Sequence, residues 1–396
     1  MIGIRSYLGS IISGLVPKKK NLILCTAWFG KKYGDSSMYF FEYLLDNSKY
    51  EVYWYAQDKE LYKNLLSQKL PVVYSNSFKG YWYQMRAKVL ISSVQFDDYN
   101  PYLINRCIYL DLGHGFPGKP GGLMTPGIST NSRNRILRLQ KSTEFYQVAP
   151  SRYCADCSHY YFATAYERII FANKPRIDVL FSKALQRRIN TLVDTIKDGR
   201  RAIVYMPTHR SCGQVKMNIE EILDLKSIQE LCREKNFVFI IKKHYYHRNE
   251  DDLTKDYSNI FDISNEVIDS QVLLSQADIL ITDFSSCYVD YLALNRPIIF
   301  YAFDYDDYLS NERDYYWKYD RITAGYTIKD KEKLNRAIED ITNDWEDTKH
   351  FEGRSAMKST YFDDKVEMGT SREKLAKVIT DLINGTYVPF NWNSKK

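Results

Sequence analysis

Three polar side chains in the second half of the chain have types and a spacing that could bind an anion. Asp283, Ser285 and Ser286 stand between a β-branched run at 278–282 and apolar residues at helical spacing at 287–294. This pattern predicts a strand, a tight turn and a helix. In a parallel α/β sheet such a turn lies at the carboxyl end of the strand, where free N–H groups of the helix attract phosphate. Asp283 would fix the turn and the serines would donate to a diphosphate, although the same residues also cap helices that bind nothing, and the local pattern favours neither interpretation.

Other groups suited to phosphate chemistry also follow predicted strands. His114 lies in the glycine and proline loop HGFPGKPGG after the strand CIYLDL, and its near-neutral pKa suits a general base, with a structural hydrogen bond as the alternative. Arg210 follows the strand AIVYMP and could make a two-pronged contact with a phosphate. Lys242 and Lys243 end the strand FVFIIKK, where alternation directs only one of them inward. We assign the donor contact to Lys243.

The sequence has no pattern that requires a metal or a cofactor. Asp304, Asp306 and Asp307 form an acidic cluster that could hold a divalent ion, but a solvated loop is the better explanation. The seven cysteines are scattered, as in a reduced cytosolic protein, and the pair Cys154 and Cys157 has no second pair to complete a zinc site. Phosphate loops of the G-x-x-x-x-G-K type and nucleophile elbows are absent from the sequence. We therefore expect a single displacement without a covalent intermediate, a metal or a cofactor.

Several sequence blocks resemble one known family. TDFSSCYVDYLALNRPIIFYAFDYDDY is similar to the T-D-[YF]-S-S-x-x-x-D-[YF] signature of the CDP-glycerol glycerophosphotransferase family, the polyol-phosphate transferases and polymerases of teichoic acid and capsule assembly. AWFGKKYGDSSMYFFEYLL, HGFPGK, YMPTHR, IIKKHYY and NKPRIDVLF resemble further blocks in the family's order, over most of the chain. The resemblance implies transfer of glycerol phosphate or ribitol phosphate from a CDP-polyol to a hydroxyl of a lipid-linked or polymeric acceptor, with release of CMP.

The resemblance also implies roles for individual residues. It makes His244 a contact of the donor phosphates and, with His114, the catalytic pair. Asp290 matches the family signature, although a brace within the sheet or helix explains it as well, and Lys119 in the HGFPGK block is a possible support. The chain departs from the usual family pattern at His209, where Trp is usual, and at Tyr245, where Pro is usual.

The length of the chain and the order of its predicted elements indicate two domains. A chain of 396 residues exceeds one compact core, and its 44% hydrophobic and 26% charged residues are typical of a globular protein. Strands and helices alternate in two series, which predicts parallel sheets built from βαβ units. We expect an α/β, GT-B-like fold with two Rossmann-like domains facing a central cleft. Residues 21–173 would bind the acceptor and residues 174–396 the nucleotide donor, with a terminal helix that could cross back.

The first 20 residues suggest a membrane-surface segment. Apolar residues at helical spacing up to residue 16 precede a basic collar of Lys18, Lys19 and Lys20, to which Arg5 adds a charge. The apolar stretch is too short to cross a membrane and lacks a cleavage site, so an amphipathic helix on an anionic membrane is expected, with a core helix as the alternative. The net charge of +6 suits an anionic partner and is too small to indicate nucleic acid. The expected location is peripheral, at the cytoplasmic face of the cell membrane.

Two other functions fit the same architecture. A GT-B sugar-nucleotide glycosyltransferase of cell-surface polysaccharide synthesis would leave a nucleoside diphosphate instead of CMP. A non-catalytic scaffold at the membrane surface would bind a nucleotide without turnover. The product released from CDP-glycerol, CDP-ribitol and UDP-sugars separates these possibilities from polyol-phosphate transfer.

Overall fold

The chain forms two compact units in a computed structural model that describes residues 4–189, 191–210, 218–244, 254–311, 315 and 317–392. The first unit comprises Met1–Gly115, Gly121–Asp178 and Phe362–Lys396, and the second comprises Phe116–Pro120 and Val179–Tyr361. The chain therefore changes units at Asp178, a few residues after the boundary suggested by the sequence. The segment Phe116–Pro120, inside the HGFPGK block, groups with the second unit.

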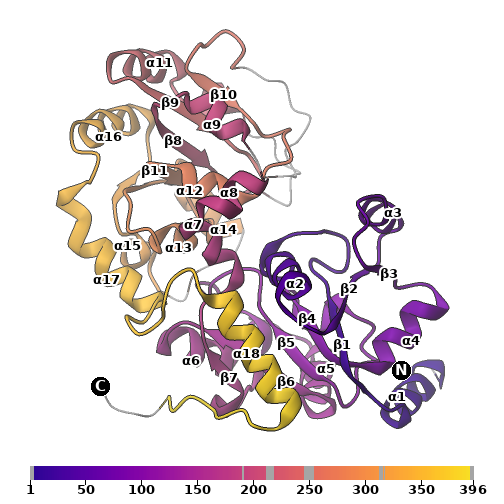
Figure 1. Cartoon of the computed structure of the whole chain (residues 1–396). Coiled ribbons are helices and arrows are strands. Elements are labelled where there is room, and N and C mark those ends of the chain that lie inside the picture. The colour runs from indigo at the N-terminus through magenta and orange to yellow at the C-terminus, as the bar shows by residue number, and fades with distance from the viewer. Residues whose placement is uncertain are drawn as a thin grey trace. The chain divides into compact units, whose positions relative to one another are not determined.

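The first unit contains a sheet of seven parallel strands in the order β3-β2-β1-β4-β5-β6-β7 (Figure 1). Its strands are β1 (Lys19–Cys25), β2 (Glu51–Ala56), β3 (Val72–Tyr74), β4 (Ala87–Ser92), β5 (Ile108–Asp111), β6 (Glu144–Ala149) and β7 (Ile169–Phe171). Its helices are α1 (Ile4–Leu15), α2 (Asp35–Asn47), α3 (Lys59–Ser67), α4 (Phe78–Arg86), α5 (Thr130–Ser142), α6 (Arg152–Phe162) and α18 (Ser371–Asn384).

The second unit contains a sheet of six parallel strands in the order β10-β9-β8-β11-β12-β13. Its strands are β8 (Arg201–Met206), β9 (Phe237–Ile241), β10 (Ile260–Asp262), β11 (Ile279–Thr282), β12 (Ile298–Tyr301) and β13 (Tyr326–Ile328). The helices from Asp178 onward are α7 (Asp178–Phe181), α8 (Lys183–Ile189), α9 (Leu192–Lys197), α10 (Ile219–Ile222), α11 (Leu225–Glu234), α12 (Ser270–Gln276), α13 (Cys287–Leu292), α14 (Tyr305–Asn311), α15 (Tyr319–Ile322), α16 (Lys331–Asn343) and α17 (Phe351–Tyr361).

Local sequence explains most of these elements. The central strands of both sheets are apolar runs buried on both faces, as parallel strands covered by helices must be. Several helices begin at a side chain that accepts a hydrogen bond from a free N–H of the first turn. These capping residues are Asp58, Ser77, Ser129, Ser151, Asp224, Asp269 and Asp330.

Each sheet has a point where the direction of strand addition reverses. In the first unit the chain adds β2 and β3 on one side of β1 and then β4 on the other side, and in the second unit β9 and β11 flank β8 in the same way. Ligands of such sheets bind outside the carboxyl ends of the strands at this reversal. The loops after β1 and β4 and the loops after β8 and β11 are therefore the places to look for a site in each unit.

After the unit boundary the chain forms three short helices, α7, α8 and α9, and the second unit ends with β13 and the helices α16 and α17. The terminal helix α18, shown in yellow in Figure 1, belongs to the first unit. The carboxylate of Asp178 accepts the backbone N–H groups of Ser371 and Arg372, both at 3.0 Å, and so holds the start of α18.

Candidate functional site

Asp283 connects the two loops at the strand reversal of the second unit. It follows β11 and is buried, and its Oδ1 accepts the Thr208 N–H at 2.8 Å, the Thr208 hydroxyl at 2.6 Å and the Phe284 N–H at 2.6 Å. Thr208 lies in the loop after β8. Asp283 thus fixes the turn, as the sequence suggested, and its carboxylate is occupied by protein donors.

Arg210 forms the two-pronged contact expected of it, but with a carboxylate. Its Nε and Nη2 donate to Asp304 Oδ2 and Oδ1 at 2.5 and 2.8 Å, and Nη2 also donates to Asp283 at 2.8 Å. Burial alone would lower the pKa of Arg210, but the hydrogen bonds with Asp304 and the charge of Asp283 outweigh burial and raise the pKa. A phosphate could use this guanidinium only by taking the place of Asp304, so the donor contact of Arg210 stays a prediction.

Both lysines after β9 are buried, so the expectation that only one points inward is wrong. Alternation ends with the strand at Ile241, and the chain then turns. Lys242 Nζ donates to the carbonyl oxygens of Ile263 and Glu266 at 3.0 and 2.6 Å. Lys243 Nζ lies 3.4 Å from an oxygen of Asp262, so its charge already has a partner inside the unit.

The two serines before α13 differ in how much of their hydroxyl is free. Ser285 Oγ accepts the Cys287 N–H at 3.3 Å and so belongs to the turn. Ser286 is exposed at the start of α13, and its side chain makes no capping hydrogen bond. Helix capping therefore does not explain Ser286, and the donor contact of its hydroxyl stays a prediction.

His244 and His209 meet beside this turn. The rings lie 4.7 Å apart between centroids, and His244 is half-buried. The structure thus brings His209, the departure from the family's usual Trp, next to the predicted catalytic His244. Tyr245, the other departure, lies outside the described residues.

Asp290 and Lys119 are held by neighbours within the second unit. Asp290 is buried in α13 and accepts a long hydrogen bond of 3.4 Å from Gln271 of α12, a placement that fits a brace between helices. Lys119 Nζ donates to the Tyr308 hydroxyl at 2.9 Å and lies 4.8 Å from the centre of the Tyr315 ring. Lys119 therefore orders aromatic side chains, which agrees with a supporting role.

His114 is exposed in the first unit, beyond the carboxyl end of β5. Its Nδ1 lies 3.1 Å from the carbonyl oxygen of Ser93, and its ring centre lies 5.2 Å from that of Trp28. A carbonyl oxygen can only accept, so Nδ1 of the neutral ring carries the proton and Nε2 keeps its lone pair. This tautomer is the one that a general base at Nε2 needs.

The loop that carries His114 is held by residues of the NKPRIDVLF block. Lys174 Nζ donates to the Leu112 carbonyl at 2.6 Å, and Arg176 Nη1 donates to the His114 carbonyl at 2.8 Å. Gly113 between them has a φ of +64°, and a Cβ there would lie 2.6 Å from the Lys174 ammonium. The family resemblance of NKPRIDVLF was the one sequence signal that pointed to these residues.

The groups considered for metal binding have other surroundings. Within the described residues, no group of three or more His, Cys, Asp and Glu side chains could hold a metal ion. Asp304 binds Arg210, while Asp306 and Asp307 are exposed in the first turn of α14. Cys154 and Cys157 form no disulfide, and burial raises the pKa of their thiols to about 12 and about 11.

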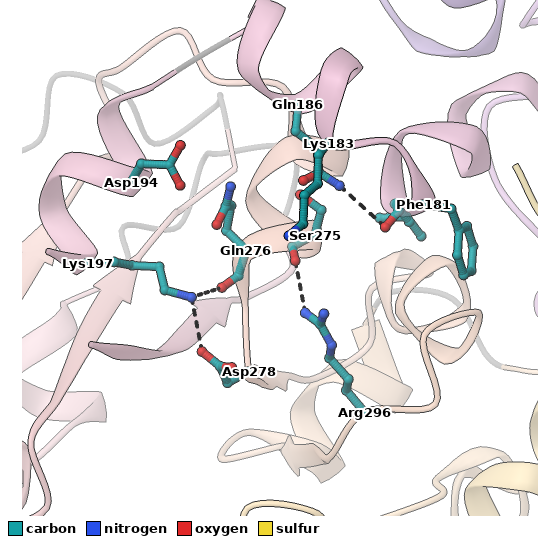
Figure 2. A pocket seen from close by; sticks show the side chains of 10 residues that line it. Phe181, Lys183, Gln186, Asp194, Lys197, Ser275, Gln276, Asp278 and Arg296 are labelled. Atoms are coloured by element: carbon teal, nitrogen blue, oxygen red, sulfur yellow. Dashed lines mark hydrogen bonds and ion pairs between the residues drawn. The ribbon is translucent and has the colours of Figure 1, made fainter. Parts of the chain in front are cut away.

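One cavity of about 460 Å³ lies at the amino end of β11, whereas the turn with Asp283 follows the carboxyl end of that strand (Figure 2). Asp278, just before β11, lines it and forms an ion pair of 3.1 Å with Lys197. Arg296 donates to the Ser275 carbonyl at 2.9 Å and closes the end of α12. None of the predicted site residues lines this cavity.

Comparisons with known proteins agree on one family. A family model described as CDP-glycerol:poly(glycerophosphate) glycerophosphotransferase matches residues 10–381. A teichoic acid poly(glycerol phosphate) polymerase of Bacillus spizizenii is 28% identical over 353 residues, which cover 84% of this chain and 86% of the relative. A teichoic acid poly(ribitol-phosphate) polymerase of the same organism is 29% identical over 208 residues, which cover 51% of this chain and 32% of the relative.

A solved structure shares the fold. The structure of the wall teichoic acid polymerase TagF aligns with a TM-score of 0.77 at 24% identity and covers 96% of this chain and 94% of that one. This likeness confirms the α/β, GT-B-like fold of two Rossmann-like domains that the sequence predicts.

Proposed function

Because the chain belongs to the CDP-glycerol:poly(glycerophosphate) glycerophosphotransferase family, we propose that its two units divide a polyol-phosphate transfer between them. The protein is an enzyme of teichoic acid synthesis that transfers a polyol phosphate from a CDP-polyol. In the proposed division, the first unit prepares the acceptor hydroxyl and the second unit holds the donor. The sugar-nucleotide transferase and the scaffold considered from the sequence lose their basis with this family membership.

The observation that carries the proposed role of the first unit is the contact of 3.1 Å between His114 Nδ1 and the Ser93 carbonyl, from which the tautomer follows. Its Nε2 lone pair takes the proton of the acceptor hydroxyl while the hydroxyl oxygen attacks the phosphorus that bears the polyol. A bond forms between that oxygen and phosphorus, and the bond from phosphorus to the bridging oxygen breaks. CMP leaves with the electron pair of the broken bond, and the polyol phosphate stays on the acceptor.

In the second unit, the start of α13 holds the donor diphosphate in this proposal. The exposed Ser286 hydroxyl, the backbone at the start of α13 and the half-buried His244 ring are the groups that contact the donor in this proposal. Asp283, Arg210 and Lys243 then serve chiefly to shape the site. This assignment moves the main phosphate contacts from the cations that the sequence suggested to hydroxyl and backbone donors.

We propose CDP-glycerol as the donor. A relative named for poly(glycerol phosphate) aligns over 84% of this chain, whereas four relatives named for ribitol phosphate align over 51% to 67% of it. The test is CMP release by the full chain from CDP-glycerol, CDP-ribitol and UDP-N-acetylglucosamine, each with a lipid-linked glycerol-phosphate acceptor. Acceptor-dependent CMP release that is fastest with CDP-glycerol supports the proposal. Faster release from CDP-ribitol would reassign the polyol, and UDP release would overturn the reaction class.

We also propose that α1 brings the enzyme to the cytoplasmic face of the membrane. Small and polar groups attach α1 to the first unit: Asn105 donates to the Ser10 carbonyl at 2.5 Å and Arg106 to the Gly14 carbonyl at 2.9 Å. The first unit does not cover three large apolar side chains of α1. Ile11, Ile12 and Leu15 are 45%, 50% and 76% exposed. A core helix would bury these side chains, so their exposure supports a membrane-facing surface.

The basic collar is smaller than the sequence indicated. Lys18 Nζ donates to the Met85 carbonyl at 2.6 Å, and burial lowers the pKa of this ammonium. Lys19 forms a 2.5 Å ion pair with Glu51, and the side chain of Arg5 lies outside the described residues. Lys20 is left as the exposed lysine of the collar, so apolar insertion must contribute most of the attachment.

Vesicle co-sedimentation tests this attachment. The double variant Ile12→Asn, Leu15→Asn should pellet less with anionic vesicles than the unchanged chain. Leu66→Asn, at a 53% exposed leucine of α3 in the same unit, is the matched control. Equal pelleting of all three proteins would contradict membrane binding through α1.

Among the helices of the described residues, none has the length and apolar character of a membrane span.

A further inference from the structure

The loop after β1 contains a left-handed turn made of residues that rarely adopt this conformation. Trp28, Phe29 and Gly30 follow one another with φ values of 52°, 61° and 67°. Such values are ordinary for Gly30 but strained for two aromatic residues, whose Cβ atoms crowd the backbone. Strained backbone of this kind persists only where the surrounding structure enforces it, and it gathers at functional sites.

A buried carboxylate and a hydroxyl enforce this turn. The Phe29 N–H donates to Asp98 Oδ1 at 2.6 Å, and the Trp28 N–H donates to the Ser93 hydroxyl at 3.0 Å. The other oxygen of Asp98 accepts the N–H groups of Ser93 and Val94, both at 2.7 Å. Asp98 therefore joins the loop after β1 to the loop after β4, at the strand reversal of the first sheet.

This network ends at His114. Ser93 donates its N–H to Asp98 and accepts the Trp28 N–H at its hydroxyl, and its carbonyl accepts the Nδ1 proton of His114. The Trp28 ring lies against the imidazole with 57° between the ring planes. The loops after β1, β4 and β5 thus meet near the buried carboxylate of Asp98. Asp98 holds Ser93 directly and holds Trp28 through Ser93 and Phe29.

A purely structural role explains this arrangement poorly. Asp98 is fully buried, and the partners seen for its carboxylate are backbone N–H groups and one serine hydroxyl, not a cation. Burying a charge in this way is unfavourable, and burial raises the pKa of Asp98 to about 6 although its backbone hydrogen bonds lower it. Two unfavourable features, a buried acid and a strained aromatic turn, stabilise each other beside the predicted base.

We propose that Asp98 and Trp28 are positioning residues for His114. Asp98 holds the Ser93 carbonyl that keeps the proton on Nδ1, and Trp28 holds the ring so that Nε2 faces the acceptor hydroxyl. This inference rests on the proposed role of His114 as the base.

The first test is kinetic. In the full chain, Asp98→Asn should lower kcat for CMP release from CDP-glycerol by roughly 10- to 100-fold while KM for the donor stays unchanged, because only the acceptor side loses alignment. Trp28→Leu should lower kcat in the same way, and Trp28→Phe, which keeps an aromatic face, should recover most of it. Asp97→Asn is the matched control, since Asp97 is adjacent but exposed and pairs with Arg135.

The second test does not depend on activity. Nitrogen-15 NMR of histidine-labelled protein reports which ring nitrogen carries the proton, and the His114 signal is identified by its loss in His114→Ala. The unchanged chain should show the proton on Nδ1, and Asp98→Asn should show a mixture of tautomers and a changed imidazole pKa. Thermal unfolding of each variant checks that it is folded.

The two tests separate this inference from the proposed function. An unchanged chain that releases no CMP yet shows the Nδ1 proton would overturn the proposed function and leave the positioning network in place. Folded Asp98→Asn and Trp28→Leu proteins with normal kcat and an unchanged His114 tautomer would overturn the positioning role. If Asp98→Asn fails to fold, the Trp28 variants decide the question alone.

Discussion

The strand reversals of the two units hold their polar side chains in opposite ways. In the first unit a buried acid, Asp98, is surrounded by N–H donors, and the functional group, His114, stays exposed and makes no ion pair. In the second unit the cation Arg210 is buried and bound to two carboxylates. In the first unit Asp98 fixes the backbone and leaves His114 exposed for a substrate. In the second unit the charged side chains themselves hold the loops together.

The comparison bears on how an anionic donor can bind. Arg210 and Lys243 supply two positive charges, and their partners Asp283, Asp304 and Asp262 supply three negative ones. These five groups therefore carry a formal charge of −1 together. They attract a diphosphate only weakly unless the ion pairs of Arg210 and Lys243 are broken. Hydroxyl and backbone donors at the start of α13 are then the better contacts.

The largest expected effect is on turnover, through the two predicted catalytic histidines. His114→Ala and His244→Ala should each lower kcat by roughly 100-fold or more, because a proton acceptor or a phosphate contact is lost. His159→Ala and His350→Ala are matched controls in the first and second units, since both rings also hydrogen-bond through Nδ1. Steady-state CMP release measures the effect, and near-normal rates in both site variants would contradict the mechanism.

The next effect is on stability and belongs to the second unit. Arg210→Ala leaves two carboxylates without their cation and should lower the free energy of unfolding by about 3–5 kcal/mol. Lys333→Ala removes an exposed partner of Asp330 in the same unit and should change the free energy of unfolding little. Denaturant unfolding compares the two. An Arg210→Ala protein of normal stability but weak CDP-glycerol affinity would show that this guanidinium is a ligand and not part of the frame.

A third effect is a pH dependence set by Asp98. Its folded-state pKa of about 6 lies above the ordinary value of 3.8, raised mainly by burial and also by the nearby Asp111. The folded chain then binds this proton more tightly than the unfolded chain, so stability is lost as pH rises from about 4 to about 6. The loss is on the order of 3 kcal/mol.

The measurement of this third effect is a difference between two proteins. The free energy of unfolding of the unchanged chain minus that of Asp98→Asn should fall between pH 4 and pH 7, because the amide does not titrate. Other acids titrate in both proteins and cancel. A difference that stays constant over this range would mean that the carboxyl titrates normally in the folded chain.

The smallest effect concerns the donor contacts. Ser286→Ala should weaken CDP-glycerol binding by about 1 kcal/mol, a factor of about five, because its exposed hydroxyl has no other role in the helix. Ser285→Ala should weaken it by less, since that hydroxyl already accepts the Cys287 N–H. Ser310→Ala in α14, whose exposed hydroxyl bonds to the Asp306 carbonyl, is the control for calorimetric titration. Unchanged affinity in Ser286→Ala would mean that the segment Asp283–Ser286 is a structural turn that binds no ligand.

Sequence patterns located the second site better than the first. The strand, turn and helix around Asp283 follow from local spacing, and the structure contains β11 and α13 in that place. The partner of Arg210 could not be predicted, because Asp304 is brought to it by the register of parallel strands and not by proximity in the chain.

The first site depends on features that local rules argue against. A left-handed conformation is expected at glycine, not at Trp28 and Phe29, and nothing near Asp98 in the sequence indicates that its carboxylate meets the loop after β1. His114 was found because a histidine within a glycine loop is itself a signal. Its supporting residues were not found because each of their contacts joins segments far apart in the chain.

The hydrogen bonds between the Asp178 carboxylate and the start of α18 have a consequence for the order of folding during synthesis. The first unit needs the segment from Phe362 onward, which the ribosome makes after the whole of Val179–Tyr361. The second unit can thus complete its sheet while the first still waits for α18, although most of the first is made earlier. Until Ser371 and Arg372 arrive, the buried carboxylate of Asp178 has no backbone donors from α18. The first unit, which carries His114, is therefore completed only when α18 has been made.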